Sequence, residues 1–255
     1  ANALSYQLLV GPAGADIDNT GVITWIPSEA QGPGTYTLTT VATDNGTPAL
    51  STTNSFTVTV GEINTVPVLP AQANRAVNEL VQLIVTNTAS DADVPANVLS
   101  YQLLSPPSGA AINNSGVITW TPSEAQGPGT YTLTTVVTDS GSPSLSSTNS
   151  FSVTVNEVNA PPVLPAQVTQ TINELVQLVV SNTGSDVDVP ANTLSYQLLN
   201  PPSGATIDSS GVIRWTPTEA QGPGTYTLTT VLNDNATPPL STTNSFTVTV
   251  NEVNS

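Results

Sequence analysis

The stretch Gln126–Thr138, QGPGTYTLTTVVT, decides the fold of this chain. It opens on Gly127-Pro128-Gly129, a combination of residues that marks a turn. The residues after this turn largely alternate threonine with larger apolar side chains. Because successive side chains of a strand point to opposite faces, the alternation predicts a β-strand with one face in a core and one face in solvent.

The same stretch occurs three times. Gln126–Thr135 recurs unchanged at Gln31–Thr40 and at Gln221–Thr230. Three tryptophans keep the same spacing of 95 residues: Trp25, Trp120 and Trp215. Self-similarity at a fixed spacing is the signature of a tandem array. We therefore predict three units, at residues 1–65, 66–160 and 161–255.

The first of these units is expected to be partial. Ala1-Asn2 aligns with Ala96-Asn97, so the first unit has no counterpart of residues 66–95. A sandwich without its first strands exposes apolar core and unpaired strand edges. We therefore expect the chain to be a window cut from a longer array of such units. The alternative is that another chain donates the missing strands.

Within the second unit, five short segments combine β-forming residues with alternating polarity, and turn residues separate them. They are Val81–Val85, Leu99–Leu104, Val117–Trp120, Thr130–Thr138 and Ser150–Val155. No stretch keeps a helical period of 3.6 residues over the length of a helix. Seven or so short strands in about 95 residues are typical of an immunoglobulin-like fold. The predicted fold class is therefore all-β, a row of tandem antiparallel β-sandwiches.

The aromatic residues fit this fold. The chain has 3 Trp, 6 Tyr and 3 Phe, and each lies at a position that recurs in every unit. In the second unit they are Tyr101, Trp120, Tyr131 and Phe151. They have mainly polar neighbours in the sequence, so we predict that they pack in the core. No further aromatic remains to stack on a sugar or a base.

The composition excludes several classes of function. The chain carries 18 Asp and Glu against 2 Lys and Arg, a net charge of −16, and it has no Cys, His or Met. Disulfides, thiolate zinc sites, histidine bases and Ser-His-Asp triads are therefore excluded. Arg75 and Arg214 are the only cations, so we expect no nucleic-acid partner. No apolar run approaches the roughly 18 residues that cross a bilayer, so no membrane insertion of this segment is expected. An acidic, cysteine-free composition favours an extracellular bacterial protein.

The positions of the carboxylates are informative, because only 8% of the residues are charged. Six carboxylates of the second unit fall at the two ends of the predicted sandwich, with Asp91, Asp93 and Asp139 at one end and Glu79, Glu124 and Glu157 at the other. Opposite ends of successive units meet at a short linker, Asn156–Pro162, so both groups should converge there. Like charges repel, and Ca²⁺ takes about six to eight oxygen ligands. The pattern predicts a Ca²⁺ site at each junction; the alternative is that these acids only solvate loops and cap turns.

Residues Val136–Asn159, VVTDSGSPSLSSTNSFSVTVNEVN, resemble the last strands and linker of a cadherin repeat. The resemblance is strongest to the cadherin-like and Ig-like tandem repeats of large bacterial surface proteins, and it extends over all three units. Several positions match the family's motifs: Asp91 and Asp93 its DxD pair, Asp139 its AxDxGxP aspartate, Glu79 its strand-A glutamate, Glu124 its LDRE glutamate, and Glu157 with Asn159 its DxNDN linker. The resemblance implies cadherin-like sandwiches and Ca²⁺ coordination between successive units.

The candidate metal ligands are these positions and some of their equivalents in the other units. They are Glu29, Glu62, Asn64, Glu79, Asp91, Asp93, Glu124, Asp139, Glu157, Asn159, Asp186, Asp188 and Asp234. Two departures from the family pattern matter. Thr121-Pro122-Ser123-Glu124 keeps only the glutamate of LDRE, and Ala160-Pro161 replaces the last Asp-Asn of DxNDN. Because two oxygen ligands are lost, we expect fewer ions per junction than in vertebrate cadherins.

Two functions follow as hypotheses. The first is a structural repeat region of an extracellular bacterial adhesin, stalk or fibre at the cell surface, made rigid by Ca²⁺ at its junctions. Its partners would be the neighbouring repeats of the same chain, further copies that assemble into fibres, or a cell-surface or polysaccharide receptor. The second is a spacer or carbohydrate-binding accessory module of a secreted multidomain enzyme. Catalysis by this segment is not expected, because it would need a carboxylate pair in a cleft in every unit.

Overall fold

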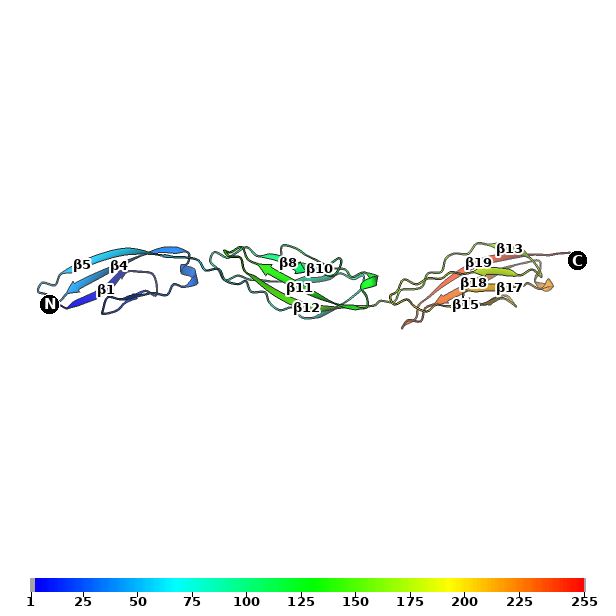
Figure 1. Cartoon of the computed structure of the whole chain (residues 1–255). Helices are drawn as coiled ribbons and strands as arrows, with labels where there is room; N and C mark the ends of the chain where they lie inside the picture. Colours follow the sequence, from blue (N-terminus) through cyan, green and yellow to red (C-terminus); the bar gives the residue numbers. More distant parts are fainter. Residues whose placement is uncertain (1–2, 255) are drawn as a thin grey trace.

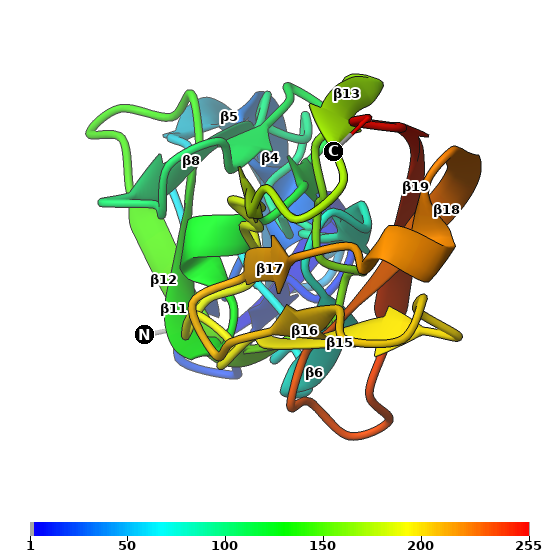
Figure 2. The ribbon, with the colours of Figure 1, turned by 90° about the vertical axis from the view of Figure 1, so that its right-hand side faces the viewer.

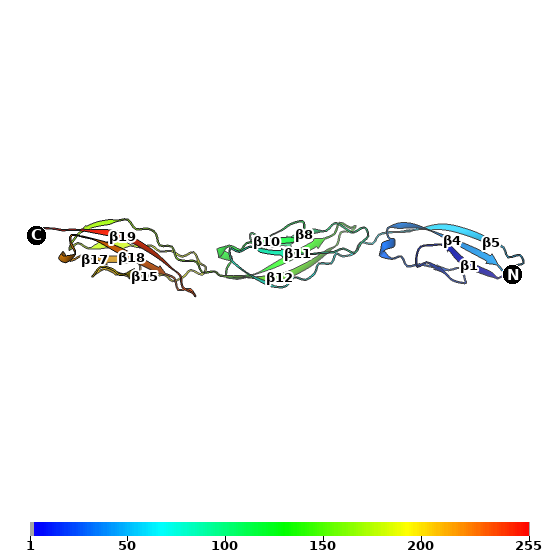
Figure 3. The same ribbon diagram turned by 180° about the vertical axis from the view of Figure 1, so that it is seen from behind.

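The computed structural model describes residues 3–254, which form three β-sandwiches joined end to end (Figure 1). The two ends of the chain lie at opposite ends of this row, as the reverse view in Figure 3 also shows. Viewed along the row, the three units project onto one another (Figure 2). The predicted all-β class of tandem sandwiches is confirmed.

The second unit packs two sheets face to face. Its strands are β6 (Arg75–Asn78), β7 (Leu83–Thr86), β8 (Ser100–Leu104), β9 (Ala111–Ile112), β10 (Val117–Trp120), β11 (Gly129–Thr138) and β12 (Ser146–Asn156). One sheet has the order β6-β12-β11-β8 and the other has the order β7-β10-β9. Five of these strands overlap the five predicted segments. The other two, β6 and β9, are not among the predicted segments.

The third unit repeats this arrangement. Its strands are β13 (Gln170–Asn173), β14 (Leu178–Ser181), β15 (Ser195–Leu199), β16 (Thr206–Ile207), β17 (Val212–Trp215), β18 (Gly224–Asn233) and β19 (Ser241–Asn251). They form sheets of the order β13-β19-β18-β15 and β14-β17-β16.

The first unit has fewer strands. They are β1 (Leu4–Val10), β2 (Asp16–Ile17), β3 (Ile23–Thr24), β4 (Gly34–Asp44) and β5 (Ser51–Val60). They form a sheet of the order β1-β4-β5 and the pair β2-β3. Within residues 3–254, no strand of this unit takes the places of β6 and β7.

The direction of the terminal strands explains why the units form a row. β6 pairs with β12 in parallel, with Arg75–Asn78 beside Val153–Asn156. The other strand pairs of the unit are antiparallel. The chain enters each sandwich at one end and leaves it at the other, so its first and last strands run the same way. We name these the entry end, which holds Asp91, Asp93 and Asp139 in the second unit, and the exit end, which holds Glu79, Glu124 and Glu157.

The core confirms the prediction for three of the four aromatic residues of the second unit. Trp120 is 1% exposed and Phe151 is 3% exposed, and Tyr131 is half-buried against the same cluster. The rings of Trp120 and Tyr131 meet edge to face, with their centroids 5.1 Å apart. The indole N–H of Trp120 donates to the carbonyl of Ser108 at 3.1 Å, so its polar atom is satisfied inside the core.

The core of the first unit is less covered. Phe56, the counterpart of Phe151, is 42% exposed. Among the described residues, no strand takes the places of β6 and β7 in this unit, so one edge of β5 and one edge of β3 lack a neighbouring strand.

Helices are minor in this fold. Those within residues 3–254 are the three-residue 3-10 turns η1 (Glu29–Gln31), η2 (Glu124–Gln126) and η3 (Glu219–Gln221). No helix in that range is long and apolar enough to cross a membrane.

Candidate metal centre at the unit junctions

The loop that carries Glu124 is fixed by its own side chains. Ser123 and Gln126 form a capping box around η2, in which the Ser123 backbone N–H donates to Gln126 Oε1 at 2.8 Å. The Gln126 side chain donates to the carbonyl of Ser108, and the Tyr131 hydroxyl donates to the carbonyl of Gln126. The repeated stretch therefore has two roles: it starts strand β11, and it holds Glu124 at the exit end.

A second glutamate reaches the same place from β6. Glu79 follows the last residue of β6 and is 2% exposed. The backbone N–H of Val158 in the linker donates to Glu79 Oε1 at 2.8 Å. A Cβ at Gly127 would overlap the Glu79 carboxylate, so the first glycine of Gly127-Pro128-Gly129 is what admits this side chain. The next residue, Leu80, has φ +58°, a left-handed conformation that leucine rarely adopts.

The junction between the second and third units therefore gathers carboxylates from both sides. Oxygens of Glu79, Glu124 and Glu157 lie within 4.8 Å of one another. Asp186 and Asp188, at the entry end of the third unit, are close enough to act on the pKa of Glu124. Five buried carboxylate oxygens receive no hydrogen bond from any described residue: Glu79 Oε2, Glu124 Oε1, both Glu157 oxygens and Asp186 Oδ2. Buried carboxylate oxygens without a donor are costly, so this site needs a proton or a cation.

The raised pKa values of two of these glutamates reflect the same cost of burying negative charge. Burial raises the pKa of Glu157 to about 7, and the carboxylates of Glu79, Glu124 and Asp188 add to the rise. Burial, followed by Glu79 and Asp188, also raises the pKa of Glu124. Both shifts show that a negative charge here is poorly compensated by the protein itself.

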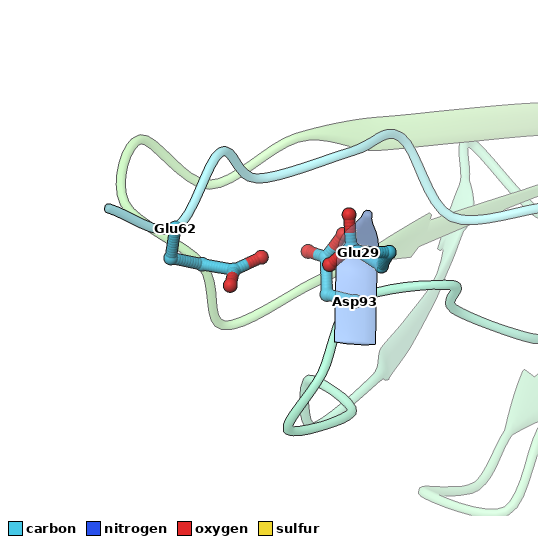
Figure 4. Close-up of side chains that lie close together, drawn as sticks. All are labelled: Glu29, Glu62 and Asp93. Atoms are coloured by element: carbon cyan, nitrogen blue, oxygen red, sulfur yellow. The ribbon is translucent and has the colours of Figure 1, made fainter. Parts of the chain in front are cut away.

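The junction between the first and second units has a smaller version of this cluster. Oxygens of Glu29, Glu62 and Asp93 lie within 4.8 Å of one another. Figure 4 shows the Glu62 carboxylate directed from the linker toward those of Glu29 and Asp93. The backbone N–H of Val94 donates to Glu29 Oε1 at 3.3 Å, a direct contact between the two units. Burial, followed by the charge of Glu29, raises the pKa of Glu62, and Asp91 Oδ2 is buried without a hydrogen bond.

A third cluster lies at the exit end of the third unit and is missing from the predicted ligands. Oxygens of Glu174, Glu219 and Glu252 lie within 4.8 Å of one another. Glu174 is 2% exposed, and its Oε2 receives no hydrogen bond from any described residue. The repeat itself is the signal for this cluster, since each of the three residues lies 95 positions after its counterpart in the second unit.

The remaining candidate ligands lie beside these clusters, in contact with one another. Asn64 Nδ2 donates to both oxygens of Asp139 at 3.1 Å, and Asn159 Nδ2 donates to Asp234 Oδ2 at 3.1 Å. Burial raises the pKa of Asp139, but the N–H donors of Leu145, Asn64 and Gly141 outweigh it, so the pKa lies below its ordinary value. The pKa of Asp234 is lowered in the same way.

The donor set of the glutamate clusters fits a hard divalent cation. All the groups are oxygens, several are buried without a hydrogen bond, and they come from flexible side chains on two units. Ca²⁺ accepts such sets of carboxylates in variable geometry, whereas Mg²⁺ demands a near-ideal octahedron. The acidic clusters at the junctions are thus consistent with calcium sites of the cadherin type.

Comparison with known sequences gives the family. The family described as "Putative Ig domain" matches residues 2–61, 63–156 and 158–251, one match for each unit. Human protocadherin gamma-C3 is 29% identical over 246 residues, which cover 85% of this chain and 26% of that protein. Mouse protocadherin Fat 4 is 33% identical over 138 residues, which cover 50% of this chain and 3% of that protein. The chain therefore spans about a quarter, or much less, of the length of these relatives.

Comparison with solved structures gives the same fold. Mouse cadherin-23 EC22-24 has a TM-score of 0.53 at 21% identity, over 98% of this chain and 87% of that one. A PcdhgB3 EC1-4 structure has a TM-score of 0.56 at 19% identity, over 99% of this chain and 67% of that one. These likenesses concern the fold, and the family match covers nearly the whole sequence. The chain therefore belongs to the Putative Ig domain family, as three tandem sandwiches of cadherin-like fold with acidic clusters at their junctions.

Proposed function

We propose that this chain is a structural segment of an extracellular bacterial adhesin, stalk or fibre, whose units are held in line by Ca²⁺ at their junctions. The observation that carries the proposal is the set of five buried carboxylate oxygens that receive no hydrogen bond at the second junction. They come from both units and from the linker between them, so a cation bound there would join all three.

The proposed ligands differ between the two junctions. At the second junction they are Glu79, Glu124, Glu157, Asp186 and Asp188; at the first they are Glu29, Glu62, Asp91 and Asp93. When bound, Ca²⁺ supplies positive charge that offsets the repulsion among these groups. The protein's own contribution is to hold Glu124 on the fixed η2 loop and Glu79 against Gly127.

Without a cation, the same groups push the units apart. The chain carries a net charge of −16, and the clustered carboxylates face one another across each junction. Repulsion between like charges at contact distance favours a bent or open joint. The row of sandwiches would then bend at its junctions while each sandwich stays folded.

An extracellular location supports this mechanism. Cadherin-like repeats are typical of extracellular domains. Calcium sites of extracellular modules bind with Kd values of about 10⁻⁴ to 10⁻³ M, which match calcium concentrations outside cells. The rigidity of the row would then follow the calcium of its surroundings.

The accessory-module alternative lacks a supporting observation. A carbohydrate platform needs exposed aromatic rings. Trp120 and Trp215 are each 1% exposed, and both pack against a tyrosine inside a core.

The test combines calorimetry with small-angle X-ray scattering of the whole chain, in CaCl2 and in EDTA. We expect Ca²⁺ to bind at the junctions, to raise Tm and to lengthen the maximum dimension. Glu124→Gln removes one charge from the second junction and should weaken binding and increase bending in CaCl2. Glu219→Gln changes the same loop in the third unit, away from both junctions, and should leave the bending unchanged. Identical scattering and Tm in CaCl2 and EDTA would end the proposal.

A further inference from the structure

The loop that follows β4 in the first unit contains a reactive pair of residues. Asn45-Gly46 comes directly after Asp44, the last residue of β4, and the Asn45 side chain is exposed. It is the only place in the sequence where asparagine precedes glycine. The backbone nitrogen after an asparagine can attack the side-chain amide and close a cyclic imide. Glycine hinders this attack least, because it has no Cβ and its backbone is the least restricted.

The loop directs the attacking nitrogen toward a carboxylate. The backbone N–H of Gly46 donates to Asp44 Oδ1 at 3.0 Å. The same oxygen accepts the backbone N–H of Leu50 at 3.0 Å, so the position of the carboxylate is fixed from two sides. A carboxylate within hydrogen-bond reach of an N–H can accept its proton as a general base. Asp44 is therefore placed to activate the Gly46 nitrogen.

The side-chain amide that is attacked is also polarised by the fold. The backbone N–H of Ala3 donates to Asn45 Oδ1 at 3.0 Å. A backbone N–H can only donate, so the oxygen of the amide, and not its nitrogen, faces Ala3. A donor on a carbonyl oxygen stabilises the negative charge that develops there during attack on the carbon. The leaving nitrogen, Asn45 Nδ2, donates to no residue within 3–254.

We propose that Asn45-Gly46 is a self-modification site, at which the loop promotes its own deamidation. The Gly46 nitrogen forms a bond to Asn45 Cγ, and the bond between Cγ and Nδ2 breaks. The proton that Gly46 loses passes to Asp44 and leaves with Nδ2 as ammonia. Water then opens the cyclic imide: attack at one carbonyl gives aspartate, and attack at the other gives isoaspartate. Water is the only co-reactant of the sequence.

The second unit has the same loop without the reactive amide. Ser140 takes the place of Asn45, and its hydroxyl receives the backbone N–H of Val98 at 3.0 Å. Gly141 takes the place of Gly46, and its N–H donates to Asp139 Oδ1 at 3.0 Å. The contacts of the loop are thus retained, but there is no amide carbon to attack.

The third unit has the amide without the glycine. Asn235 Oδ1 receives the backbone N–H of Thr193 at 2.7 Å, and the N–H of Ala236 donates to Asp234 Oδ1 at 3.1 Å. Both polarising contacts are therefore present. However, the methyl group of Ala236 restricts the backbone that must bend to close the ring. Asn235 is thus the control that the chain itself provides.

The reaction would change the entry end of the first unit permanently. Both products place a negative charge beside the carboxylate of Asp44, and like charges repel. In isoaspartate, the main chain also passes through the side-chain carbon, which lengthens the loop by one atom. The Asn45 backbone N–H donates to the Ala3 carbonyl at 3.1 Å, so the contact between β1 and the end of β4 would loosen. Neither product returns to asparagine, and the inference does not depend on the proposed function.

The test follows the full chain over time at neutral pH, folded in buffer and unfolded in concentrated urea. Peptic digestion at low pH and mass spectrometry measure the conversion of Asn45 and Asn235, and isoaspartyl methyltransferase detects isoaspartate. We expect Asn45 to convert several times faster than Asn235, and at least about tenfold faster in the folded chain than in urea. Slower conversion of Asn45 in the folded chain than in urea would overturn the inference, because the loop would then protect the amide.

A reciprocal pair of variants separates the role of the glycine from that of the loop. Gly46→Ala should slow Asn45 to the rate of Asn235, and Ala236→Gly should raise Asn235 to the rate of Asn45. Circular dichroism confirms that each variant is folded. An Asn235 that stays slow in Ala236→Gly would contradict the inference, since that loop would then hold every group that the reaction needs.

Asp44→Asn tests the base. The new side chain keeps an oxygen that can accept the N–H of Gly46, but it does not take up a proton. Conversion of Asn45 in the folded variant should therefore fall by at least about tenfold, to the rate that the unaltered chain shows in urea. An unchanged rate in a folded variant would show that the loop does not promote the reaction.

Discussion

The two junctions of this chain use the same loop and the same linker pattern but enclose their carboxylates differently. At the second junction, Glu79 enters from β6, binds the linker at Val158 and fills the space above Gly127. At the first junction, no described residue takes the place of Glu79. A Cβ at Gly32 would come no closer than 3.3 Å to another atom, the carbonyl oxygen of Gly61.

The difference shows what makes an acidic cluster into an enclosed site. Glu29 and Glu62 are exposed, whereas Glu79 is 2% exposed and leaves Glu124 and Glu157 half-buried beside it. The last strand also differs, since β12 extends to Asn156 beside Asn78, whereas β5 ends at Val60. One buried glutamate from the first strand of a unit therefore closes the exit end. Four predictions test this comparison, from the largest expected effect to the smallest.

Alanine at the two equivalent glycines should have unequal effects. Gly127→Ala displaces the Glu79 carboxylate and should destabilise the second unit by about 2 kcal/mol. Gly32→Ala places its Cβ 3.3 Å from the Gly61 carbonyl oxygen, a much milder contact, and should cost less than about 1 kcal/mol. Neither glycine has a positive φ, so the comparison isolates the space that Glu79 needs. Urea unfolding measures both, and equal losses would show that Glu79 does not decide the difference.

Calcium affinity should differ between the junctions by about tenfold, because the number of charged ligands tunes the Kd of such sites. The second junction, with Glu79, is the tighter one. Glu29→Gln should therefore remove the weaker class of sites from a calorimetric titration, and Glu124→Gln the tighter class. A single class of sites that both variants weaken equally would contradict the assignment.

Without calcium, the stability of the second unit should fall as pH rises. Glu157 has a pKa of about 7 in the folded protein, raised from an ordinary 4.5, and that of Glu124 is also raised. The folded state holds the extra protons, so the stability is full below about pH 4.5 and is lost as pH rises through 7. In EDTA, Tm should drop by a few degrees between about pH 5 and pH 7.5, and CaCl2 should abolish the drop.

The opposite dependence belongs to the aspartates beside the linker. The pKa values of Asp139 and Asp234 are lowered from 3.8, so their contribution is present above that pH and is lost as pH falls below it. The glutamate prediction would be contradicted if Tm in EDTA stayed flat from about pH 5 to pH 7.5. The negative charges of Glu124 and Glu157 would then be compensated in some other way.

A hydroxyl on the linker should give the smallest effect. Thr65 Oγ1 donates to Asp93 Oδ1 at 2.6 Å, whereas the equivalent linker residue at the second junction is Ala160. Ala160→Thr should add about 0.5–1 kcal/mol to the stability of the third unit, and Thr65→Ala should remove a similar amount from the second. Thermal unfolding measures both changes, and effects of the same sign would contradict the equivalence of the two sites.

Much of the fold follows from the sequence, because strand periodicity and the 95-residue repeat are local patterns. The long strands β11 and β12 both overlap their predicted segments. The short strand β6 leaves no such pattern, since only the neighbouring β12 makes Arg75–Asn78 a strand. Its parallel pairing is a consequence of how the chain passes through the unit, which four residues cannot show.

The carboxylates of the candidate site could be predicted from the sequence. The contacts that hold these side chains in place could not. Grouping Glu79, Glu124 and Glu157 at one end needed only the strand order, and the structure does bring them together. The role of Gly127 depends on the Glu79 side chain arriving from another strand at the same point, which a local sequence pattern does not show. That these positions bind metal stays a prediction.

The parallel pairing of β6 with β12 has a mechanical consequence. A pull on the two ends of the row drags these strands in opposite directions along their own length. Their hydrogen bonds, over Arg75–Asn78 and Val153–Asn156, are then loaded in shear and must break together, not one after another. β13 and β19 repeat this arrangement in the third unit. Under tension, each complete sandwich therefore resists unfolding as one unit. We expect the chain to extend first in the linkers.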